Sequence, residues 1–302
     1  MIDIAIVGGG PAGLSAGIYG ARSGRSTVLF EGVFLGGQIT RTASVENYPG
    51  FYESIDGFSI ADKFEKQAVR FGLEIKSENV TALQLSGITK KIICGSNTYE
   101  AKTVIIATGA MPRKLGISRE GELTGAGISY CATCDGAFFR EKAVAVVGGG
   151  DTAVSDALYL AKFASRVYLV HRRNQLRAVQ TLQDALRGEK RIELVLDNVP
   201  NEICGESAVS ALKVRNVKTD AVRKLEVEGI FVAIGIDPNS SVVKDELKLD
   251  NGGYIITDTK LNTSVTGVFA AGDVRDTPLR QVVTAAADGA VAATSAIEYL
   301  MA

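Results

Sequence analysis

Two stretches of the chain repeat the same order of apolar and polar positions. Residues 3–24, DIAIVGGGPAGLSAGIYGARSG, begin with a short apolar run, pass through a glycine turn and end in an alanine-rich segment with apolar residues at helical spacing. Residues 143–164, AVAVVGGGDTAVSDALYLAKFA, repeat this order. A second β-branched run follows each copy, at residues 26–31 and 165–173. The pattern therefore predicts strand, glycine turn, helix and strand, twice over, in an α/β fold.

Both glycine turns have the spacing of a dinucleotide-binding fingerprint. The positions are Gly8, Gly10 and Gly13 in the first copy, and Gly148, Gly150 and Ala153 in the second. Glycine permits the tight turn and lets backbone N–H groups approach a pyrophosphate at the start of the helix. One match would be weak evidence, but two in the same strand–helix context predict two Rossmann-like dinucleotide-binding domains.

Three further apolar runs indicate how the two domains are arranged along the chain. Residues 102–110 and 229–239 each run into a glycine turn, so each can complete one domain. Residues 266–274 form a third such run, which has no counterpart in the second copy. The first domain is therefore expected to be discontinuous, with the second inserted into it. The expected bounds are residues 1–112 with 244–302, and an inserted domain at 113–243.

The residue that ends the second strand of such a unit contacts the adenosine ribose. In the first copy this residue is Glu31, whose carboxylate would accept hydrogen bonds from ribose hydroxyls and repel a 2′-phosphate. In the second copy the same place holds HRRNQLR, with His171, Arg172, Arg173 and Arg177. Guanidinium groups suit a 2′-phosphate. The first domain therefore fits FAD or NAD, and the second fits NADPH.

Composition and charge narrow the setting in which such a fold would act. The 302 residues are 46% hydrophobic and carry a formal net charge of -1. We therefore expect no nucleic-acid partner and no membrane-binding surface. Because the sequence contains no recognisable signal peptide or long apolar span, we expect a cytoplasmic location.

Two of the four cysteines, Cys131 and Cys134, stand three positions apart in SYCATCDG, residues 129–136. A zinc site is disfavoured because the other ligands would have to converge from distant strands, and the only histidine is His171. A structural disulfide is disfavoured by a reducing compartment and by the small loop that it would close. The pair therefore favours a reversible dithiol/disulfide couple. Asp135, directly after it, is either a general acid/base or a turn residue.

The ordered set of motifs resembles the thioredoxin reductases of the low-molecular-weight, bacterial type, over essentially the whole chain. Between and around the two fingerprints lie GGQ at 36–38, VENYPG at 45–50, ATGA at 107–110, CATCDG at 131–136 and GVFAAGDV at 267–274. The resemblance implies FAD in the discontinuous domain, NADPH in the inserted domain, a homodimer, and thioredoxin as the disulfide substrate.

By motif matching, the resemblance also implies which residues contact each cofactor. The implied FAD contacts are Gly8, Gly10, Pro11, Ala12, Gly13, Glu31, Gly36, Gly37, Gln38, Asn47, Gly272, Asp273, Arg280, Gln281 and Val282. The NADPH contacts are Gly148, Gly150, Asp151, Thr152, His171, Arg172, Arg173, Arg177, Ile234 and Gly235. Asp151 departs from the uncharged residue that also occurs in the family, and an acid beside a pyrophosphate is unfavourable unless it points away.

The resemblance further implies roles for the cysteine pair. Cys131 would attack thioredoxin, Cys134 would take electrons from the flavin, and Asp135 would donate the proton. Electrons would pass from NADPH to FAD and then to the 131–134 disulfide. Because nicotinamide and disulfide lie in one domain and must meet the same flavin, the resemblance implies a rotation at the two crossings between domains.

Three other functions remain open. The chain could reduce a different dithiol protein, such as a glutaredoxin-like or peroxiredoxin partner. It could be an NADPH–flavin reductase for another acceptor, although CATCDG argues against this because such relatives lack the cysteine pair. It could also be a flavin-binding redox sensor without turnover.

Overall fold

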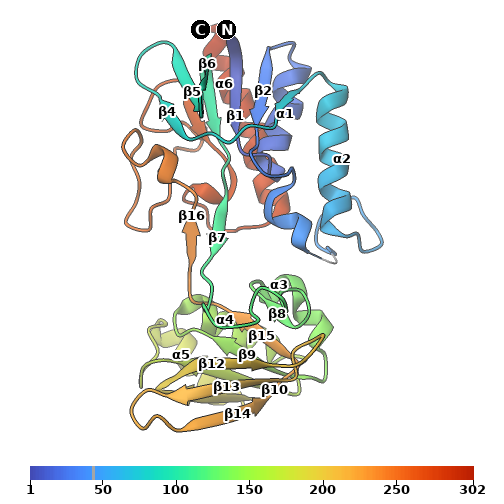
Figure 1. The fold of residues 1–302 in the computed structure, drawn as a ribbon, viewed down its shortest axis with the longest axis vertical. Coiled ribbons are helices and arrows are strands. Elements are labelled where there is room, and N and C mark those ends of the chain that lie inside the picture. Colours follow the sequence, from blue (N-terminus) through green and yellow to red (C-terminus); the bar gives the residue numbers. More distant parts are fainter. Residues whose placement is uncertain (43–44) are drawn as a thin grey trace. The chain divides into compact units, whose positions relative to one another are not determined.

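The computed structural model describes residues 1–42 and 45–302, which form two compact units. Unit 1 consists of Met1–Met111 and Asp237–Ala302, and unit 2 consists of Pro112–Ile236 (Figure 1). Unit 1 is therefore discontinuous in sequence. The second crossing lies between residues 236 and 237, whereas the sequence analysis placed the end of the inserted domain at residue 243.

Backbone contacts hold the residues after the second crossing in unit 1. The Asn239 N–H donates to Gly109 O (2.9 Å), and Thr108 Oγ1 donates to Asn239 O (2.7 Å). The crossings are made by two short strands that pair with each other, β7 (Ala110–Pro112) and β16 (Ile236–Pro238).

Seven of the described strands form the sheet of unit 1, in the order β3-β2-β1-β6-β5-β4 with β17 beside β6. They are β1 (Ile2–Val7), β2 (Thr27–Phe30), β3 (Glu74–Lys76), β4 (Ala82–Gln84), β5 (Lys90–Cys94), β6 (Asn97–Ile106) and β17 (Val268–Ala270). β1 is parallel to β2 and β6, whereas β5 is antiparallel to β4 and β6. β17 pairs in parallel with the second half of β6, so the chain after the second crossing completes this sheet.

The sheet of unit 1 has an apolar core on each face, as the alternation of side chains along a strand requires. Ile4 and Ile6 of β1 belong to one core, and Ala5 and Val7 belong to the other. All four are almost completely buried, which explains why β1 reads as a continuous apolar run.

Helices of unit 1 pack on the first of these cores. The helical segments are α1 (Pro11–Arg22), α2 (Gly57–Arg70) and α6 (Val282–Met301), with the 3-10 turns η1 (Gly37–Arg41), η3 (Ser241–Val243) and η4 (Gly272–Val274). Helices α1 and α6 approach so closely that a β-carbon on Gly289 would lie 2.9 Å from Ala16 N and overlap Ala12 O. Small residues on both helices permit this contact.

Unit 2 has a parallel sheet in the order β11-β10-β9-β15-β8 and a separate antiparallel sheet, β12-β13-β14. The strands are β8 (Ile128–Ser129), β9 (Ala143–Val147), β10 (Arg166–His171), β11 (Ile192–Leu196), β12 (Asn198–Cys204), β13 (Ala211–Asn216), β14 (Val222–Glu226) and β15 (Gly229–Val232). The helices are α3 (Ala132–Asp135), α4 (Asp151–Leu160) and α5 (Gln180–Gly188), with the 3-10 turn η2 (Gly136–Phe139).

The two units share one topology at their centres. In unit 1, β1 lies between β2 and β6, and in unit 2, β9 lies between β10 and β15, with all pairs parallel. This confirms the predicted α/β fold with a repeated strand–glycine turn–helix–strand unit.

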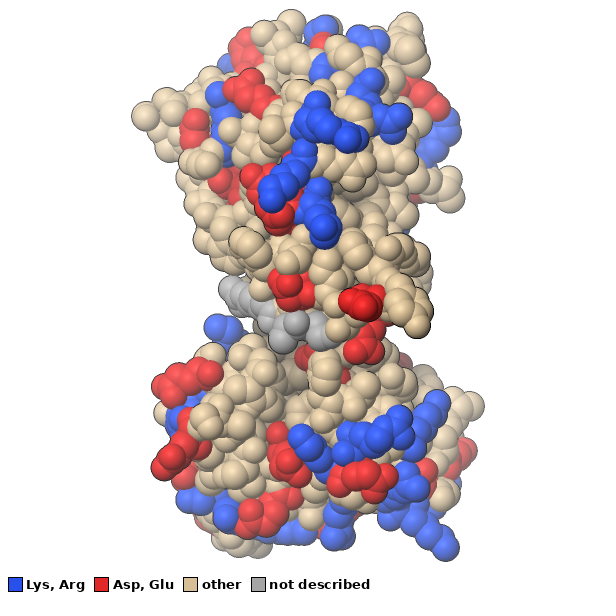
Figure 2. All heavy atoms as spheres, turned by 90° about the vertical axis from the view of Figure 1, so that its right-hand side faces the viewer, with Lys and Arg blue, Asp and Glu red and all other residues tan. Residues whose placement is uncertain are grey.

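The surface carries both signs of charge. Lys and Arg side chains occur together with Asp and Glu on the face drawn in Figure 2, in keeping with the formal net charge of -1. In the described part of the chain, no helix has both the length and the apolar character needed to cross a membrane.

Candidate active site

Cys131 and Cys134 form a disulfide just after strand β8, with their Cα atoms 5.3 Å apart. Cys131 is the N-cap of α3, and its Sγ accepts the Cys134 N–H (3.2 Å). Cys94 and Cys204 are free thiols. Within residues 1–42 and 45–302, no group of three or more His, Cys, Asp or Glu side chains could hold a metal. The pair is therefore in the oxidised form of the predicted dithiol/disulfide couple.

Asp135, the residue after Cys134, is hydrogen-bonded and half-buried. Ser129 Oγ donates to Asp135 Oδ2 (2.6 Å) and accepts the Cys131 N–H (3.0 Å). Burial raises the pKa of the Asp135 carboxyl, and the bond from Ser129 partly opposes this. A carboxyl that stays protonated to higher pH can deliver a proton to a thiolate. The sequence analysis did not single out Ser129, which tunes this acid.

The glycine turn of unit 2 joins β9 to α4. Gly148 has a φ of +154°, and a β-carbon there would lie 2.7 Å from Ala153 Cβ. Gly150 is the N-cap of α4 and supplies no side-chain cap, and nothing lies within 4 Å of the place its β-carbon would take. The N–H groups of the first turn of α4 thus lie beside a space that an anionic group can enter.

The ring of His171, at the end of β10, lies against Gly149, where a β-carbon would be 2.5 Å from His171 Cγ. His171 is 5% exposed, and its Nε2 has no hydrogen-bond partner among the described residues. Burial lowers the pKa of His171, and Arg177, Arg172 and Arg173 lower it further. The neutral form of the ring is therefore favoured at pH 7, and its Nε2 is left without a partner among the described residues.

The segment after β10 folds back to the glycine turn. The Arg177 N–H donates to Gly149 O (2.6 Å), while the side chains of Arg172 and Arg173 are exposed. Asp151 Oδ1, in the first turn of α4, accepts the Val179 N–H (2.8 Å). This acid, unfavourable beside a pyrophosphate, is thus bonded to the backbone that follows the arginines.

The remaining predicted residues of unit 2 lie around the same turn. Thr152 is exposed in the first turn of α4, and half-buried Ile234 and exposed Gly235 follow β15. Gly235 has a φ of +124°, and a β-carbon there would lie 3.1 Å from Arg113 Nη1. The Arg113 N–H donates to Gly235 O (3.0 Å). Arg113 is a neighbour of this region that the sequence motifs did not reveal.

The turn of unit 1 repeats this construction. Gly8 has a φ of +108°, and a β-carbon there would lie 3.0 Å from Thr108 Cα. A β-carbon on Gly13 would overlap Gly8 O, whereas Gly10 has nothing within 4 Å of its own. Helix α1 begins at Pro11, and its N-cap Gly10 makes no side-chain cap.

Glu31, at the end of β2, takes the place that His171 has in unit 2. Its carboxylate accepts the N–H groups of Gly9 (2.8 Å) and Val33 (3.0 Å). A β-carbon on Gly9 would lie 3.1 Å from Glu31 Cγ. In each unit, then, the middle glycine of the turn contacts the residue that ends the second strand. The sequence analysis missed Gly9 and Gly149, although the letters GGG in both turns carried the signal.

The GGQ motif lies against the turn of unit 1. The Gly36 N–H donates to Gly9 O (2.7 Å), and a β-carbon on Gly37 would lie 3.3 Å from Gly10 Cα. Both Gly36 and Gly37 have positive φ, +99° and +60°, a conformation that glycine adopts without strain. The Gln38 amide donates to Ala110 O.

Further residues that the sequence analysis assigned to the FAD site lie in the C-terminal part of unit 1. A β-carbon on Gly272 would lie 2.9 Å from Ala12 Cβ, so η4 contacts the start of α1. Burial raises the pKa of Asp273 to about 6, and the charge of Arg280 opposes this. The Arg280 guanidinium lies 4.6 Å from the centre of the Tyr254 ring, and its buried Nε has no hydrogen-bond partner among the described residues.

The start of α6 completes the group. Gln281 is the N-cap, with a capping box to Thr284, and Val282 is the first helical residue. Asn47 Nδ2 donates to Gln281 Oε1 (2.9 Å), which joins the VENYPG motif to this helix start. The structure thus gathers the predicted residues of unit 1 around the beginnings of α1 and α6.

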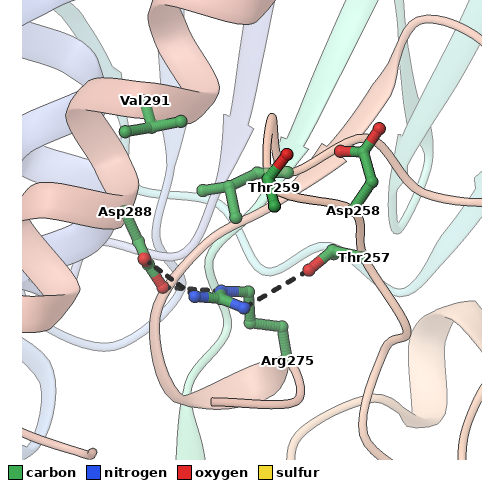
Figure 3. A pocket seen from close by; sticks show the side chains of 7 residues that line it. Thr257, Asp258, Thr259, Arg275, Asp288 and Val291 are labelled. Carbon is green, nitrogen blue, oxygen red and sulfur yellow. Dashed lines mark hydrogen bonds and ion pairs between the residues drawn. The ribbon is translucent and has the colours of Figure 1, made fainter. Parts of the chain in front are cut away.

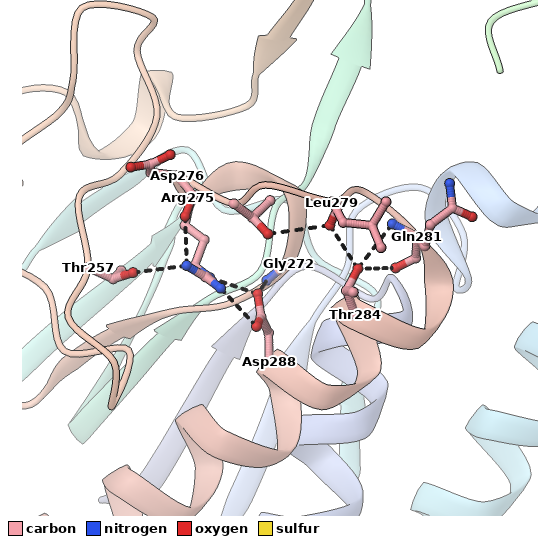
Figure 4. A network of polar contacts seen from close by, with 9 residues as sticks. Thr257, Gly272, Arg275, Asp276, Leu279, Gln281, Thr284 and Asp288 are labelled. Carbon is pink, nitrogen blue, oxygen red and sulfur yellow. Dashed lines mark hydrogen bonds and ion pairs between the residues drawn. The ribbon is translucent and has the colours of Figure 1, made fainter. Parts of the chain in front are cut away.

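An ion pair fixes η4 to α6. Asp288 on α6 accepts hydrogen bonds from Arg275 Nε (2.7 Å), Arg275 Nη2 (3.0 Å) and the Gly272 N–H (3.0 Å) (Figure 4). Arg275 also contacts Thr257, and Arg275 and Asp288 line a pocket with Thr257 and Val291 (Figure 3). Arg275 and Asp288 neutralise each other's charge in this pocket, and their hydrogen bonds hold η4 against α6.

Comparison with known proteins places the chain among disulfide oxidoreductases. Residues 2–289 match the family model described as pyridine nucleotide-disulphide oxidoreductase. A thioredoxin reductase of Peptoclostridium acidaminophilum is 47% identical over 304 residues, covering 99% of this chain and 96% of the relative. The crystal structure of thioredoxin reductase from Streptococcus pyogenes MGAS5005 matches with a TM-score of 0.95 and 44% identity, over 100% of this chain and 98% of that one. Thioredoxin reductase from Giardia duodenalis matches with a TM-score of 0.93 and 39% identity, over 100% and 99%.

Replacing Asp288 by Asn should destabilise unit 1, because it leaves the Arg275 charge mostly buried without its counter-charge. We expect a loss of about 2 kcal/mol in the free energy of unfolding, measured by urea denaturation. The control is Lys260→Met, which removes an ion pair whose side chains are 67% and 55% exposed. Such a pair contributes about 0–1 kcal/mol. Equal losses in the two variants would contradict a supporting role for Asp288.

Proposed function

This chain belongs to the pyridine nucleotide-disulphide oxidoreductase family, among the low-molecular-weight thioredoxin reductases, and we propose that it reduces the disulfide of thioredoxin with electrons from NADPH passed through FAD. The observation that carries the proposal is the Cys131–Cys134 disulfide beside Asp135, in the unit that also holds the second glycine turn. The family uses FAD and a nicotinamide dinucleotide, and their assignment to units 1 and 2 is part of the proposal.

The residues of unit 1 fit FAD. The open space at Gly10 and the uncapped start of α1 suit a pyrophosphate. Glu31 keeps acceptor capacity for ribose hydroxyls beyond its two backbone bonds. The buried Nε of Arg280, which has no hydrogen-bond partner among the residues that the structure describes, supports a ligand beside the start of α6. Gly36, Gly37, Gln38, Asn47, Gly272 and Asp273 would line the same site.

The residues of unit 2 fit NADPH. The start of α4 at Gly150 offers the same uncapped N–H groups as α1, and the buried His171 Nε2 has no hydrogen-bond partner in the described part of the chain. Exposed Arg172, Arg173 and Arg177 surround this nitrogen with positive charge that suits a 2′-phosphate. Thr152, Ile234 and Gly235 would complete the site.

When bound, the two cofactors supply the electron pair that opens the Cys131–Cys134 disulfide. In the exchange that follows, the Cys131 thiolate attacks one sulfur of the thioredoxin disulfide, forms a mixed disulfide and releases one thioredoxin thiolate, which takes a proton from Asp135. The Cys134 thiolate then attacks Cys131 Sγ, re-forms the internal disulfide and releases the second thioredoxin sulfur as a thiolate, which takes a proton from water. The protein's contribution is to hold the two sulfurs and the acid in one turn of chain.

Two further elements belong to the proposal. We propose that the enzyme is a homodimer, as the resemblance implies. We also propose that unit 2 rotates relative to unit 1 between the half-reactions. The chain crosses between the units twice, at residues 111–112 and 236–237, and such a narrow connection supports this movement.

The FAD-loaded protein should oxidise NADPH in the presence of thioredoxin, and Cys131→Ser or Cys134→Ser should lower kcat by about 10³-fold or more. The matched control is Cys204→Ser, since Cys204 is a free thiol away from the pair. The measurement is NADPH absorbance with thioredoxin, with glutaredoxin and without a dithiol acceptor. If turnover survives the loss of either cysteine, the dithiol mechanism is ruled out. If the enzyme turns over with glutaredoxin and not with thioredoxin, thioredoxin is not its substrate.

Replacing Arg172 and Arg173 by Ala should raise KM for NADPH by about 10–100-fold and leave KM for NADH nearly unchanged. Each guanidinium can form charge-assisted hydrogen bonds to a 2′-phosphate that NADH lacks. The control is Arg187→Ala, an exposed arginine of α5 paired with Asp184. If KM rises equally for NADPH and NADH, the arginines do not recognise the 2′-phosphate.

Thiol exchange should slow as pH rises through the pKa of Asp135, because only the protonated acid can donate. Ser129→Ala should shift this fall to higher pH, since the bond from Ser129 lowers that pKa. Asp135→Asn should abolish the fall and reduce the rate by about 10²-fold. Rates of thioredoxin reduction by the pre-reduced enzyme across pH test this, with Ser295→Ala as control because Ser295 Oγ bonds only Lys260 O among the described contacts. A shift to lower pH in Ser129→Ala would contradict the assignment.

A further inference from the structure

A buried carboxylate lies beside the cysteine segment and has no place in the exchange chemistry above. Glu120 is 4% exposed. Its Oε1 accepts the Leu115 N–H (2.7 Å) and the Tyr130 hydroxyl (2.8 Å), and its Oε2 accepts the Gly116 N–H (2.9 Å). Thr124 Oγ1 donates to the Glu120 carbonyl (2.7 Å) and fixes its backbone.

The donors come from two parts of unit 2 that matter for the proposed reaction. Leu115 and Gly116 belong to the first stretch of unit 2 after the crossing strand β7, close to Arg113, whose N–H is bonded to Gly235. Tyr130 directly precedes Cys131. A single side chain therefore connects the chain that enters unit 2 with the residue that precedes the predicted nucleophile.

A buried carboxylate is stable only when its oxygens are hydrogen-bonded, so these three bonds constrain their donors strongly. The Tyr130 hydroxyl is held at one end by Glu120, and the Cys131 N–H is held at the other by Ser129 Oγ (3.0 Å). The backbone between them has little freedom to turn. Cys131, as N-cap of α3, takes its direction from this backbone.

We propose that Glu120 and Tyr130 are positioning residues for the Cys131–Cys134 couple. Through the Tyr130 hydroxyl, Glu120 makes the cysteine segment and the entry segment 113–116 one body, so that Cys131 keeps its direction when the chain moves at the crossing. The inference rests on the proposed function for its kinetic consequence, although the positioning itself concerns unit 2 alone.

Tyr130→Phe tests this in the full-length FAD-loaded enzyme, because it removes the hydroxyl and keeps the ring. The matched control is Tyr99→Phe, which removes a hydroxyl bond of the same kind, to Glu78 Oε1 (2.6 Å), in unit 1. We expect Tyr130→Phe to lower kcat with thioredoxin about tenfold with KM within about twofold, since a small misplacement of a reacting atom is costly. Tyr99→Phe should change neither.

Amide hydrogen exchange of residues 129–136 separates this inference from the proposed function. We expect about tenfold faster exchange in Tyr130→Phe. We expect the same or more in Glu120→Gln, because the amide nitrogen accepts no bond and so cannot replace either Oε1, which accepts from Tyr130 and Leu115, or Oε2, which accepts from Gly116. If the wild-type enzyme does not reduce thioredoxin, the proposed function is wrong. The comparison of hydrogen exchange would still show whether Glu120 and Tyr130 position the cysteine segment. Unchanged exchange in Tyr130→Phe, or a rise in KM with kcat unchanged, would overturn the inference.

Discussion

The contact between the first strand of each unit and the helix that follows it is the constraint on which the rest of the molecule depends. At Gly8 and Gly148 the backbone turns at positive φ where a side chain would meet the next strand's end, at Thr108 and at Ala233. Because no side chain intervenes, α1 and α4 begin directly at the carboxyl ends of the strands. The first-turn N–H groups are thereby left without a side-chain cap in both units, and the two proposed nucleotide sites share this geometry.

The same backbone turn is followed by side chains of different charge in the two units. The middle glycine contacts the Glu31 carboxylate in unit 1 and the His171 ring in unit 2, so the residue at the end of the second strand sets the charge beside the glycine turn. Arginines follow His171 in unit 2, where burial lowers the pKa of His171 and the arginine charges lower it further. The duplication thus repeats a scaffold, and the proposed difference in cofactor specificity lies in a few positions at and after the ends of β2 and β10.

Much of this could be read from the sequence because the signals are local. The fingerprints, the cysteine pair and the residue ending each second strand lie within short stretches, and Glu31 and His171 do lie at the ends of β2 and β10. Contacts between distant residues could not be predicted. Arg280 stacks on Tyr254, Asp288 binds η4, and Glu120 binds Tyr130, and no motif marks any of these pairs. The second crossing was placed too late because Asn239 is tied to unit 1 by bonds to residues 108 and 109, which no local pattern reveals.

The discontinuity of unit 1 has a consequence for how the chain is made. Unit 2 is continuous from Pro112 to Ile236, so all its strands are synthesised before β17 and α6. The first 111 residues lack two elements of unit 1 until then. These are β17, which pairs with β6, and α6, whose small residues pack against α1. The sheet of unit 1 and the contact between α1 and α6 can therefore form completely only after the whole of unit 2 has been synthesised.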